Sequence, residues 1–234
     1  MSYDYNGFVQ SLAGMLVIPA TNTDFLTNLP NVIDDAEQRI YRELDLLATI
    51  VRQTGAFTMN SRNFILPSGA GRFVVTESMS VIDLSGARRA LIPASREYID
   101  FVYGSDTPNT TPSYPEYYGM LTDQTVLVGP PPDSAYTVEV TGTIRPTPLS
   151  PTNTTTYLTN YLPDLFLAEA MIFGYGYMKD FGAIADDPQG SASWTKHYQD
   201  LWQSANTEEQ RKRYASMVWN SKQPSPIATP PRAQ

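Results

Sequence analysis

Residues 29–47 read LPNVIDDAEQRIYRELDLL, and this stretch decides the helical part of the fold. Its apolar residues recur at steps of three and four, which draws one stripe along a helix: Leu29, Val32, Ile33, Ala36, Ile40, Leu44 and Leu47. Pro30 suits the first turn of such a helix, where its missing N–H has no partner in any case. The other positions are mostly charged, and we expect them to form a solvated face.

Helices are also expected on both sides of this stretch. Residues 5–18 are apolar enough for a short helix that ends at Pro19, and residues 20–27 read as a linker. A second long helix should start near Asn160, and its part from 165 to 181 is apolar almost all round. Because a helix without a polar face must be covered on most sides, we expect neighbouring subunits to supply part of that cover. A third helix should run over residues 191–220.

The middle of the chain favours β structure. β-branched and aromatic runs occur at 49–54, 56–59, 64–66, 72–76, 79–84, 117–121, 125–128 and 136–144, with turn signals at 60–61, 67–69 and 85–86. A short helix is expected over 93–101, with Ser95 as its cap. The predicted fold is therefore α+β: a helical bundle from the N- and C-terminal helices, a central antiparallel β-rich insertion, and an extended, proline-rich C-terminal arm. The expected division is 1–47 plus 157–220, then 48–156, then 221–234.

The net charge and the amino-acid composition exclude several classes of function. The net charge is −8, whereas a generic nucleic-acid binder carries a basic field. An acidic surface is suited to a channel wall that DNA passes without sticking, although it is also the commonest way to stay soluble. The chain has no cysteine, so disulfides, thiolate metal sites and a cysteine nucleophile are excluded. No run approaches the roughly 20 apolar residues of a membrane span, and the start lacks the basic region of a secretory signal.

Several strings resemble the head-to-tail adaptor (connector) proteins of tailed bacteriophages. The stretch from Leu29 resembles the opening helix of that family, and Pro148-Leu149-Ser150 resembles the approach to its second helix. The run 160–165, with Glu169-Ala170 and 177–180, is similar to that helix, and Trp194 and Tyr198 are similar to its W-x-x-x-Y segment. The strings occur in the family's order from about residue 29 to residue 198.

This resemblance implies a non-enzymatic virion protein at the head–tail junction, made in the host cytoplasm and needing no cofactor. Such proteins form a ring, usually of twelve copies, that docks on the portal, lengthens the DNA channel and offers a platform to tail nozzle, tube or fibre proteins. The portal or subunit interface is then expected at Phe166, Met171, Phe173, Tyr177, Arg211, Arg213, Trp219, Pro224, Ile227 and Pro230. The tail interface is expected at Tyr114, Tyr117 and Tyr118, although a loop packed on its own sheet would explain those tyrosines equally well.

Candidate catalytic and metal residues have simpler explanations. The single histidine, His197, lies outside any HExxH or Gly-x-Ser-x-Gly motif and is assigned a structural role. Asp34, Asp35 and Glu37 could be imagined as acid–base carboxylates but are expected on a solvated face. Asp186-Asp187 is explained by a turn before Pro188 as well as by a divalent ion. The glycine-rich run 68–71 reads as a hairpin turn and not as a phosphate cradle, because it opens no helix.

Two rival functions stay open at this point. One is another neck or tail-tube completion subunit, which the order of helices cannot separate from an adaptor. The other is a carbohydrate-binding or hydrolytic tail protein, suggested by the tyrosine-rich middle. The one basic cluster, Arg211-Lys212-Arg213, either pairs with Glu208 and Glu209 along its helix or meets an acidic partner at the portal.

Overall fold

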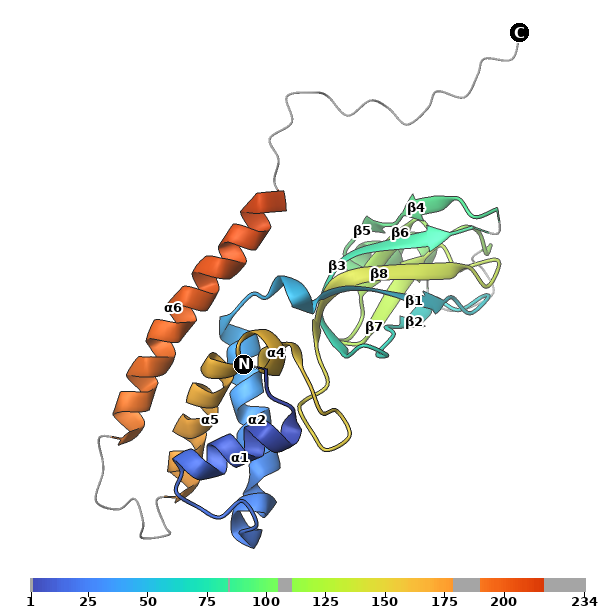
Figure 1. Cartoon of the computed structure of the whole chain (residues 1–234). Coiled ribbons are helices and arrows are strands. Elements are labelled where there is room, and N and C mark those ends of the chain that lie inside the picture. The colour runs from blue at the N-terminus through green and yellow to red at the C-terminus, as the bar shows by residue number, and fades with distance from the viewer. Residues whose placement is uncertain (1, 84, 105–110, 179–189, 217–234) are drawn as a thin grey trace.

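The computed structural model describes residues 2–83, 85–104, 111–178 and 190–216 (Figure 1). The helices are α1 (Tyr5–Met15), α2 (Thr23–Glu43), α3 (Arg96–Tyr103), α4 (Tyr157–Tyr161), α5 (Pro163–Met178) and α6 (Gly190–Ser216), with a 3₁₀ turn η1 (Leu47–Thr49). The strands are β1 (Ile50–Ala56), β2 (Asn63–Ile65), β3 (Arg72–Ile82), β4 (Arg88–Ala90), β5 (Ile92–Pro93), β6 (Tyr117–Met120), β7 (Thr125–Gly129) and β8 (Thr137–Arg145). The predicted α+β class is confirmed, with helices from both ends of the chain around a β-rich middle. The C-terminal arm lies outside the described residues.

Helix α2 is longer at its start than the sequence predicts. It begins at Thr23 because the Asn22 side chain accepts hydrogen bonds from the N–H groups of Asp24 and Phe25, at 2.9 and 3.0 Å. Pro30 therefore lies inside the helix, on an exposed position where only one backbone hydrogen bond is lost. The expected linker over 20–27 is largely helical, and the helix ends at Glu43, since Leu44 is already extended.

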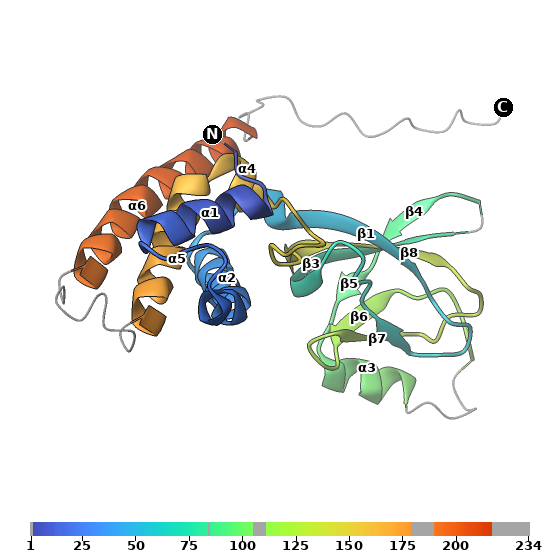
Figure 2. The same cartoon turned by 60° about the horizontal axis from the view of Figure 1, so that its bottom comes forward.

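The helical core closes around α5. Figures 1 and 2 show α5 among α1, α2, α4 and α6. The ring of Phe166 stacks on that of Phe8, with centroids 4.3 Å apart, and Phe166 and Met171 are fully buried. The expectation that neighbouring subunits supply part of the cover of α5 is therefore wrong for Phe166 and Met171, and it stays a prediction for the half-buried Phe173. The chain supplies this cover itself, because α1, α2, α4 and α6 all contact α5.

The β part is a sandwich of two sheets. The first has the strand order β1-β8-β3-β4 and is antiparallel throughout, and the second has the order β2-β7-β6-β5, in which only the β5–β6 pair is parallel. Residues of β8 alternate between buried and less buried, which turns Val138, Val140 and Ile144 into the space between the sheets. The glycine-rich run 68–71 joins β2 to β3 across the two sheets, so it is a turn but not the expected hairpin.

Strand β3 is one strand, although its sequence predicts two. Its register against β8 shifts between Phe73 and Val75 and again between Thr76 and Ser78. These irregularities interrupt the alternation of apolar residues, which is the signal that separates strands in a sequence. Gly142 lies opposite them on β8, where a Cβ atom would come within 2.1 Å of the Val75 carbonyl oxygen. Only glycine allows the two backbones to approach this closely.

The placement of Phe166 predicts a large loss of stability on truncation. Phe166→Ala should lower the free energy of unfolding by about 3–5 kcal/mol, because it removes a stacked ring from a filled core. Tyr161→Ala, at a ring that is 69% exposed, should change it by less than about 0.5 kcal/mol. Urea denaturation of both variants measures this. Equal, small losses would show that Phe166 is not part of the subunit's own core.

Candidate assembly surfaces

A cluster of charged and aromatic side chains joins the three long helices. Arg39 of α2 donates to Glu43 Oε1 from Nε and to Glu169 Oε1 of α5 from an Nη atom, both at 2.8 Å. The Tyr198 hydroxyl of α6 donates to Glu43 Oε2 at 2.7 Å, and the Arg39 guanidinium lies 4.9 Å from the centre of the Tyr198 ring. We call Arg39, Glu43, Glu169 and Tyr198 the Arg39 cluster. Its members come from both ends of the chain, so it fixes α5 and α6 against α2.

Burial dominates the electrostatics of the Arg39 cluster. The Glu169 side chain has no exposed surface, and its desolvation raises the pKa to about 7 although Arg39 pulls it down. Desolvation opposes ionisation of Glu43 as well, yet the hydrogen bonds from Arg39 and Tyr198 leave the pKa of Glu43 below its ordinary value. The pKa of Tyr198 is raised, first by burial and then by the hydrogen bond to Glu43. The cluster is thus a structural ion pair in a poorly hydrated setting.

A second set of contacts fixes the end of α6 to the start of the β part. Glu209, which is buried, accepts hydrogen bonds from the Leu47 N–H at 2.9 Å and from Lys212 Nζ at 2.7 Å. Arg213 bonds the carbonyl oxygen and a carboxylate oxygen of Asp45, at 2.9 and 2.6 Å. These contacts place the last turns of α6 beside η1, the segment that leads into β1 (Figures 1 and 2).

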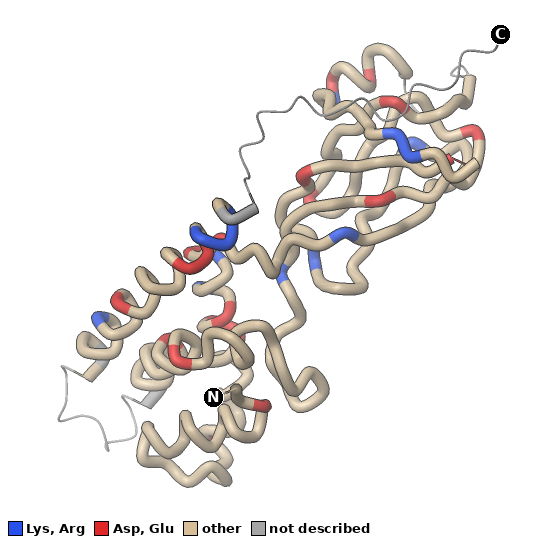
Figure 3. The backbone as a smooth tube through the Cα atoms, turned by 45° about the horizontal axis from the view of Figure 1, so that its top comes forward, with Lys and Arg blue, Asp and Glu red and all other residues tan. Residues whose placement is uncertain are grey.

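Basic residues lie together near the end of α6 (Figure 3), and only some of them form ion pairs within the described part of the chain. Lys212 forms ion pairs with both Glu208 and Glu209 at 2.7 Å. For Lys212 this agrees with the first alternative from the sequence, in which the basic cluster pairs along its own helix. Arg213 pairs with Asp45. Arg211 is exposed and makes no ion pair with any residue that the structure describes, which leaves its guanidinium available to a partner.

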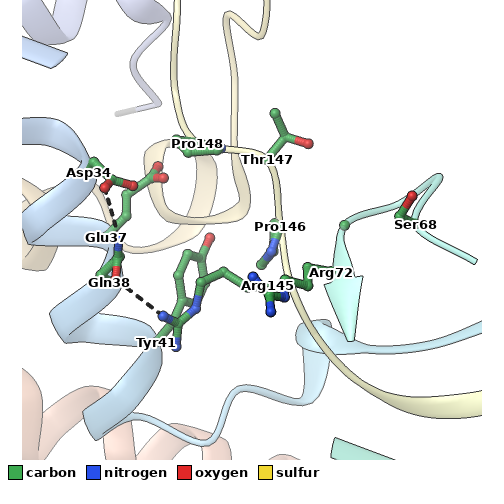
Figure 4. A pocket seen from close by; sticks show the side chains of 11 residues that line it. Asp34, Glu37, Gln38, Tyr41, Ser68, Arg72, Arg145, Pro146, Thr147 and Pro148 are labelled. Atoms are coloured by element: carbon green, nitrogen blue, oxygen red, sulfur yellow. Dashed lines mark hydrogen bonds between the residues drawn. The ribbon is translucent and has the colours of Figure 1, made fainter. Parts of the chain in front are cut away.

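A pocket of about 360 Å³ lies where the helical and β parts meet (Figure 4). It is lined by one side of α2, by the turn before β3, and by the end of β8 with the linker that follows it. The Tyr41 hydroxyl and Arg145 Nε are buried there without a hydrogen-bond partner among the described residues. The Leu149 N–H donates to both carboxylate oxygens of Glu37 at 3.3 Å, so Glu37 ties α2 to this linker.

The burial of Glu37 corrects the prediction that the charged face of α2 is solvated. The Glu37 side chain is 2% exposed, and burial raises its pKa to about 8 against the lowering effects of Leu149 and Thr156. Asp34 and Asp35 are half-buried, and Asp34 accepts a hydrogen bond from Gln38 at 2.7 Å. The linker after β8 covers this face, and no periodicity in α2 could reveal a cover that comes from more than a hundred residues away.

The other candidates for chemistry are placed as follows. His197 is exposed, and its ring lies 5.7 Å from that of Trp194. Both residues line a pocket of about 410 Å³ to which α1, α5 and α6 contribute. Within the described part of the chain, no three His, Cys, Asp or Glu residues come together as a metal site would require. Asp186 and Asp187 lie outside the described residues. No helix among those described is long and apolar enough to cross a membrane.

The structure separates the predicted portal or subunit interface into three groups. Phe166 and Met171 are enclosed in this chain's own core, so their side chains cannot contact a neighbour. Phe173, Arg213 and Arg211 retain exposed surface. The side chain of Tyr177, together with residues Trp219, Pro224, Ile227 and Pro230, lies outside what the structure describes.

The tyrosines predicted to face the tail pack mainly on their own sheets. Tyr114 contacts the Tyr136 ring at 5.1 Å and donates from its hydroxyl to the Val81 carbonyl. Tyr118 is buried between the sheets, while Tyr117 packs against Tyr98 of α3 with ring centroids 5.6 Å apart. The sequence left two interpretations open, a tail interface or a loop packed on its own sheet. The second interpretation fits Tyr114 and Tyr118.

Helix α3 carries an exposed apolar face that the sequence analysis missed. Ile99 is fully buried against β6 and β7, whereas Phe101 is 90% exposed and Tyr98 and Val102 are each close to half exposed. Figure 2 shows α3 on the outer side of the second sheet. We call Tyr98, Phe101 and Val102 the α3 patch. The sequence contained a signal for this patch, since a helix of eight residues with one fully buried residue and four more apolar residues cannot bury them all.

The raised pKa of Glu37 predicts a pH-dependent stability. In the folded chain the carboxyl stays protonated up to about pH 8, whereas in the unfolded chain it ionises near its ordinary value of 4.5. The unfolded state therefore binds fewer protons between these pH values, and stability falls as pH rises through this window. Glu37→Gln removes the ionisation, so it should stabilise the chain more at pH 8 than at pH 5.

Denaturation at the two pH values measures this effect. The exposed Glu97→Gln on α3 is the matched control and should show no such pH-dependent gain. Parallel stability curves for Glu37→Gln and the unmodified chain would contradict the buried, protonated state of Glu37.

Comparison with known proteins agrees with the features assembled above. Residues 4–223 match the family described as the SU10 adaptor protein, which spans both helical ends and the β-rich middle. No individual curated protein matches the chain significantly. The chain therefore belongs to the SU10 adaptor protein family and is a bacteriophage adaptor protein.

Proposed function

We propose that this adaptor forms a ring of twelve copies that docks on the portal, extends the DNA channel and provides the attachment platform for the tail. Membership of the adaptor family over residues 4–223 is the observation that carries the proposal. The net charge of −8 supports a channel through which DNA passes without specific binding, because like charge disfavours contact with phosphates. Catalysis has no part in this proposal, in keeping with a structural adaptor family.

The portal side of the ring is proposed at the end of α6. Arg211 offers an exposed guanidinium, a group that recognises carboxylates with good geometry. The following residues, Trp219, Pro224, Ile227 and Pro230, complete this proposed interface, since an extended segment can wrap a partner surface. Among the residues first expected there, Phe166 and Met171 are excluded by their burial.

The tail side is proposed at the α3 patch. An exposed phenylalanine beside a tyrosine is typical of protein interfaces, where aromatic side chains contribute much of the binding energy. The α3 patch replaces Tyr114 and Tyr118 in this role, because those rings are occupied by their own sheets. Tyr117 stays at its margin through its contact with Tyr98.

Two variants should separate the two ends of the ring. Arg211→Glu should weaken binding to the phage's own portal and leave attachment of tail proteins to preformed rings unchanged. Phe101→Ser should do the reverse. Lys196→Glu, an exposed charge reversal in the other half of α6, is the control and should affect neither. A chain that ends at Trp219 should also lose portal attachment.

Native mass spectrometry of the chain alone and mixed with portal measures these outcomes. A monomer that becomes a twelve-copy ring on the portal is the expected result. A ring that forms without portal and caps tail tubes would favour the rival neck or tail-tube subunit. Portal binding that is unchanged in both Arg211→Glu and the shortened chain would contradict the proposed portal side.

A further inference from the structure

Two arginines lie opposite each other where the first sheet meets α2. Arg72 of β3 and Arg145 of β8 are partners in the strand register, so their Cβ atoms lie on the same face of the sheet. Both residues line the pocket of about 360 Å³ at the junction of the helical and β parts. Because like charges directly opposite each other destabilise a sheet, this arrangement needs anions nearby.

Within this pair, Arg72 has an anion and Arg145 has none. Arg72 forms an ion pair with Asp123, and both of those side chains are largely exposed. Arg145 is partly buried and forms no ion pair with any side chain in the described ranges. One of its Nη atoms donates to Gln38 Oε1 at the long distance of 3.4 Å, and its Nε atom is buried without a partner there. A guanidinium held partly out of water without an anion is destabilising.

The same pocket contains a second unused donor. The hydroxyl of Tyr41, on α2, is buried without a hydrogen-bond partner in the described part of the chain. Figure 4 shows Gln38 and Tyr41 on one side of Arg145 and Arg72 on the other. Glu37 also lines the pocket, but burial raises its pKa to about 8, so its carboxyl is uncharged at neutral pH. A guanidinium N–H and a hydroxyl therefore wait for a ligand that accepts hydrogen bonds.

Charge and geometry favour a carboxylate as that ligand. The Nε edge of a guanidinium presents two parallel N–H groups, which match the two oxygens of a carboxylate. Arg72 is already paired with Asp123, and Asp34 adds a negative charge to the pocket lining. One uncompensated guanidinium then fits a singly charged group better than a doubly charged phosphate. A volume of about 360 Å³ has room for a small acid or an acidic side chain.

We propose that this pocket binds one carboxylate group, held by the Nε edge of Arg145 and by the Tyr41 hydroxyl. The bound carboxylate would connect α2 to β8 and so fix the helical part against the β part. It can come from a free small acid or from an acidic side chain of a second copy, since each copy has 24 Asp and Glu residues against 16 Lys and Arg. This inference does not depend on the proposed function, because it is tested on the chain alone.

A titration of the dilute full chain with acetate at pH 7 tests the pocket, with the Nε–H signals of the arginines followed by NMR. The Arg145 signal should shift and saturate, with half-saturation on the order of millimolar, because acetate is small and makes few contacts. Arg52, an exposed arginine of β1 outside the pocket, is the internal control and should not shift. Equal shifts at both arginines, no shift at Arg145, or the same shift with chloride at equal ionic strength would overturn the proposal.

Two substitutions with a matched control test the contacts. Arg145→Gln should abolish the acetate-induced shifts of the backbone amides of residues 38–41, whereas Arg52→Gln should retain them. Tyr41→Phe removes only the hydroxyl and should raise the half-saturation concentration several-fold with an otherwise unchanged amide spectrum. Shifts that persist in Arg145→Gln would overturn the proposal, and unchanged affinity in Tyr41→Phe would overturn the placement of the carboxylate beside Tyr41.

Two further titrations distinguish the anion and its source. An Arg145 signal that shifts with rising protein concentration, in a way that acetate suppresses, would support a carboxylate from a second copy. A signal that responds to acetate and not to protein concentration would support a free acid. Inorganic phosphate that binds more tightly than acetate would overturn the choice of a carboxylate.

Discussion

The fold depends on the buried carboxylate of Glu169 and on the arginine that compensates it. A carboxylate without exposed surface is costly unless it is paired, and Arg39 is the cation that the chain brings to it, at 2.8 Å. Arg39 reaches Glu169 only when α5 lies along α2, and it reaches the face of Tyr198 only when α6 lies there too. The cluster therefore selects one packing of α2, α5 and α6, because its contacts form only in that arrangement. Once α6 is placed, Glu209 and Arg213 can connect it to the segment before β1.

A subunit packed in this way is largely complete by itself, which changes where assembly contacts must be sought. In α5, the most apolar helix, the apolar side chains over Leu165–Met171 are buried in the chain's own core. Features left exposed lie away from that core: Arg211 near the end of α6, the α3 patch on the second sheet, and the pocket between Arg145 and α2. These are small surfaces with defined chemistry. They suit an adaptor that folds first and binds its neighbours afterwards.

The sequence was most informative where local signals and tertiary structure agree. The apolar stripe from Leu29, the Ser95 cap and the alternation along β8 all predict elements that the structure contains. Prediction failed where distant segments decide the outcome. The sequence predicts a solvated Glu37, because the linker that buries this side chain is more than a hundred residues away. It predicts two strands in place of β3, because the register shifts that interrupt the apolar alternation lie opposite Gly142 on the distant strand β8. The surplus of apolar residues in α5 was real, but the sequence could not tell whether the cover came from this chain or another.

A double-mutant cycle on Arg39 and Glu169 tests the central claim most directly. At pH 9, above the pKa of about 7 at which Glu169 titrates beside Arg39, Arg39→Met should lower the free energy of unfolding by about 3–5 kcal/mol, because it leaves a buried carboxylate without its cation. Glu169→Met in the same chain should restore much of that loss, since the two apolar side chains then pack without an unpaired charge. Chemical denaturation of the two single variants and the double variant gives both quantities. Losses below about 1 kcal/mol that simply add would describe an ordinary surface ion pair and would contradict the account.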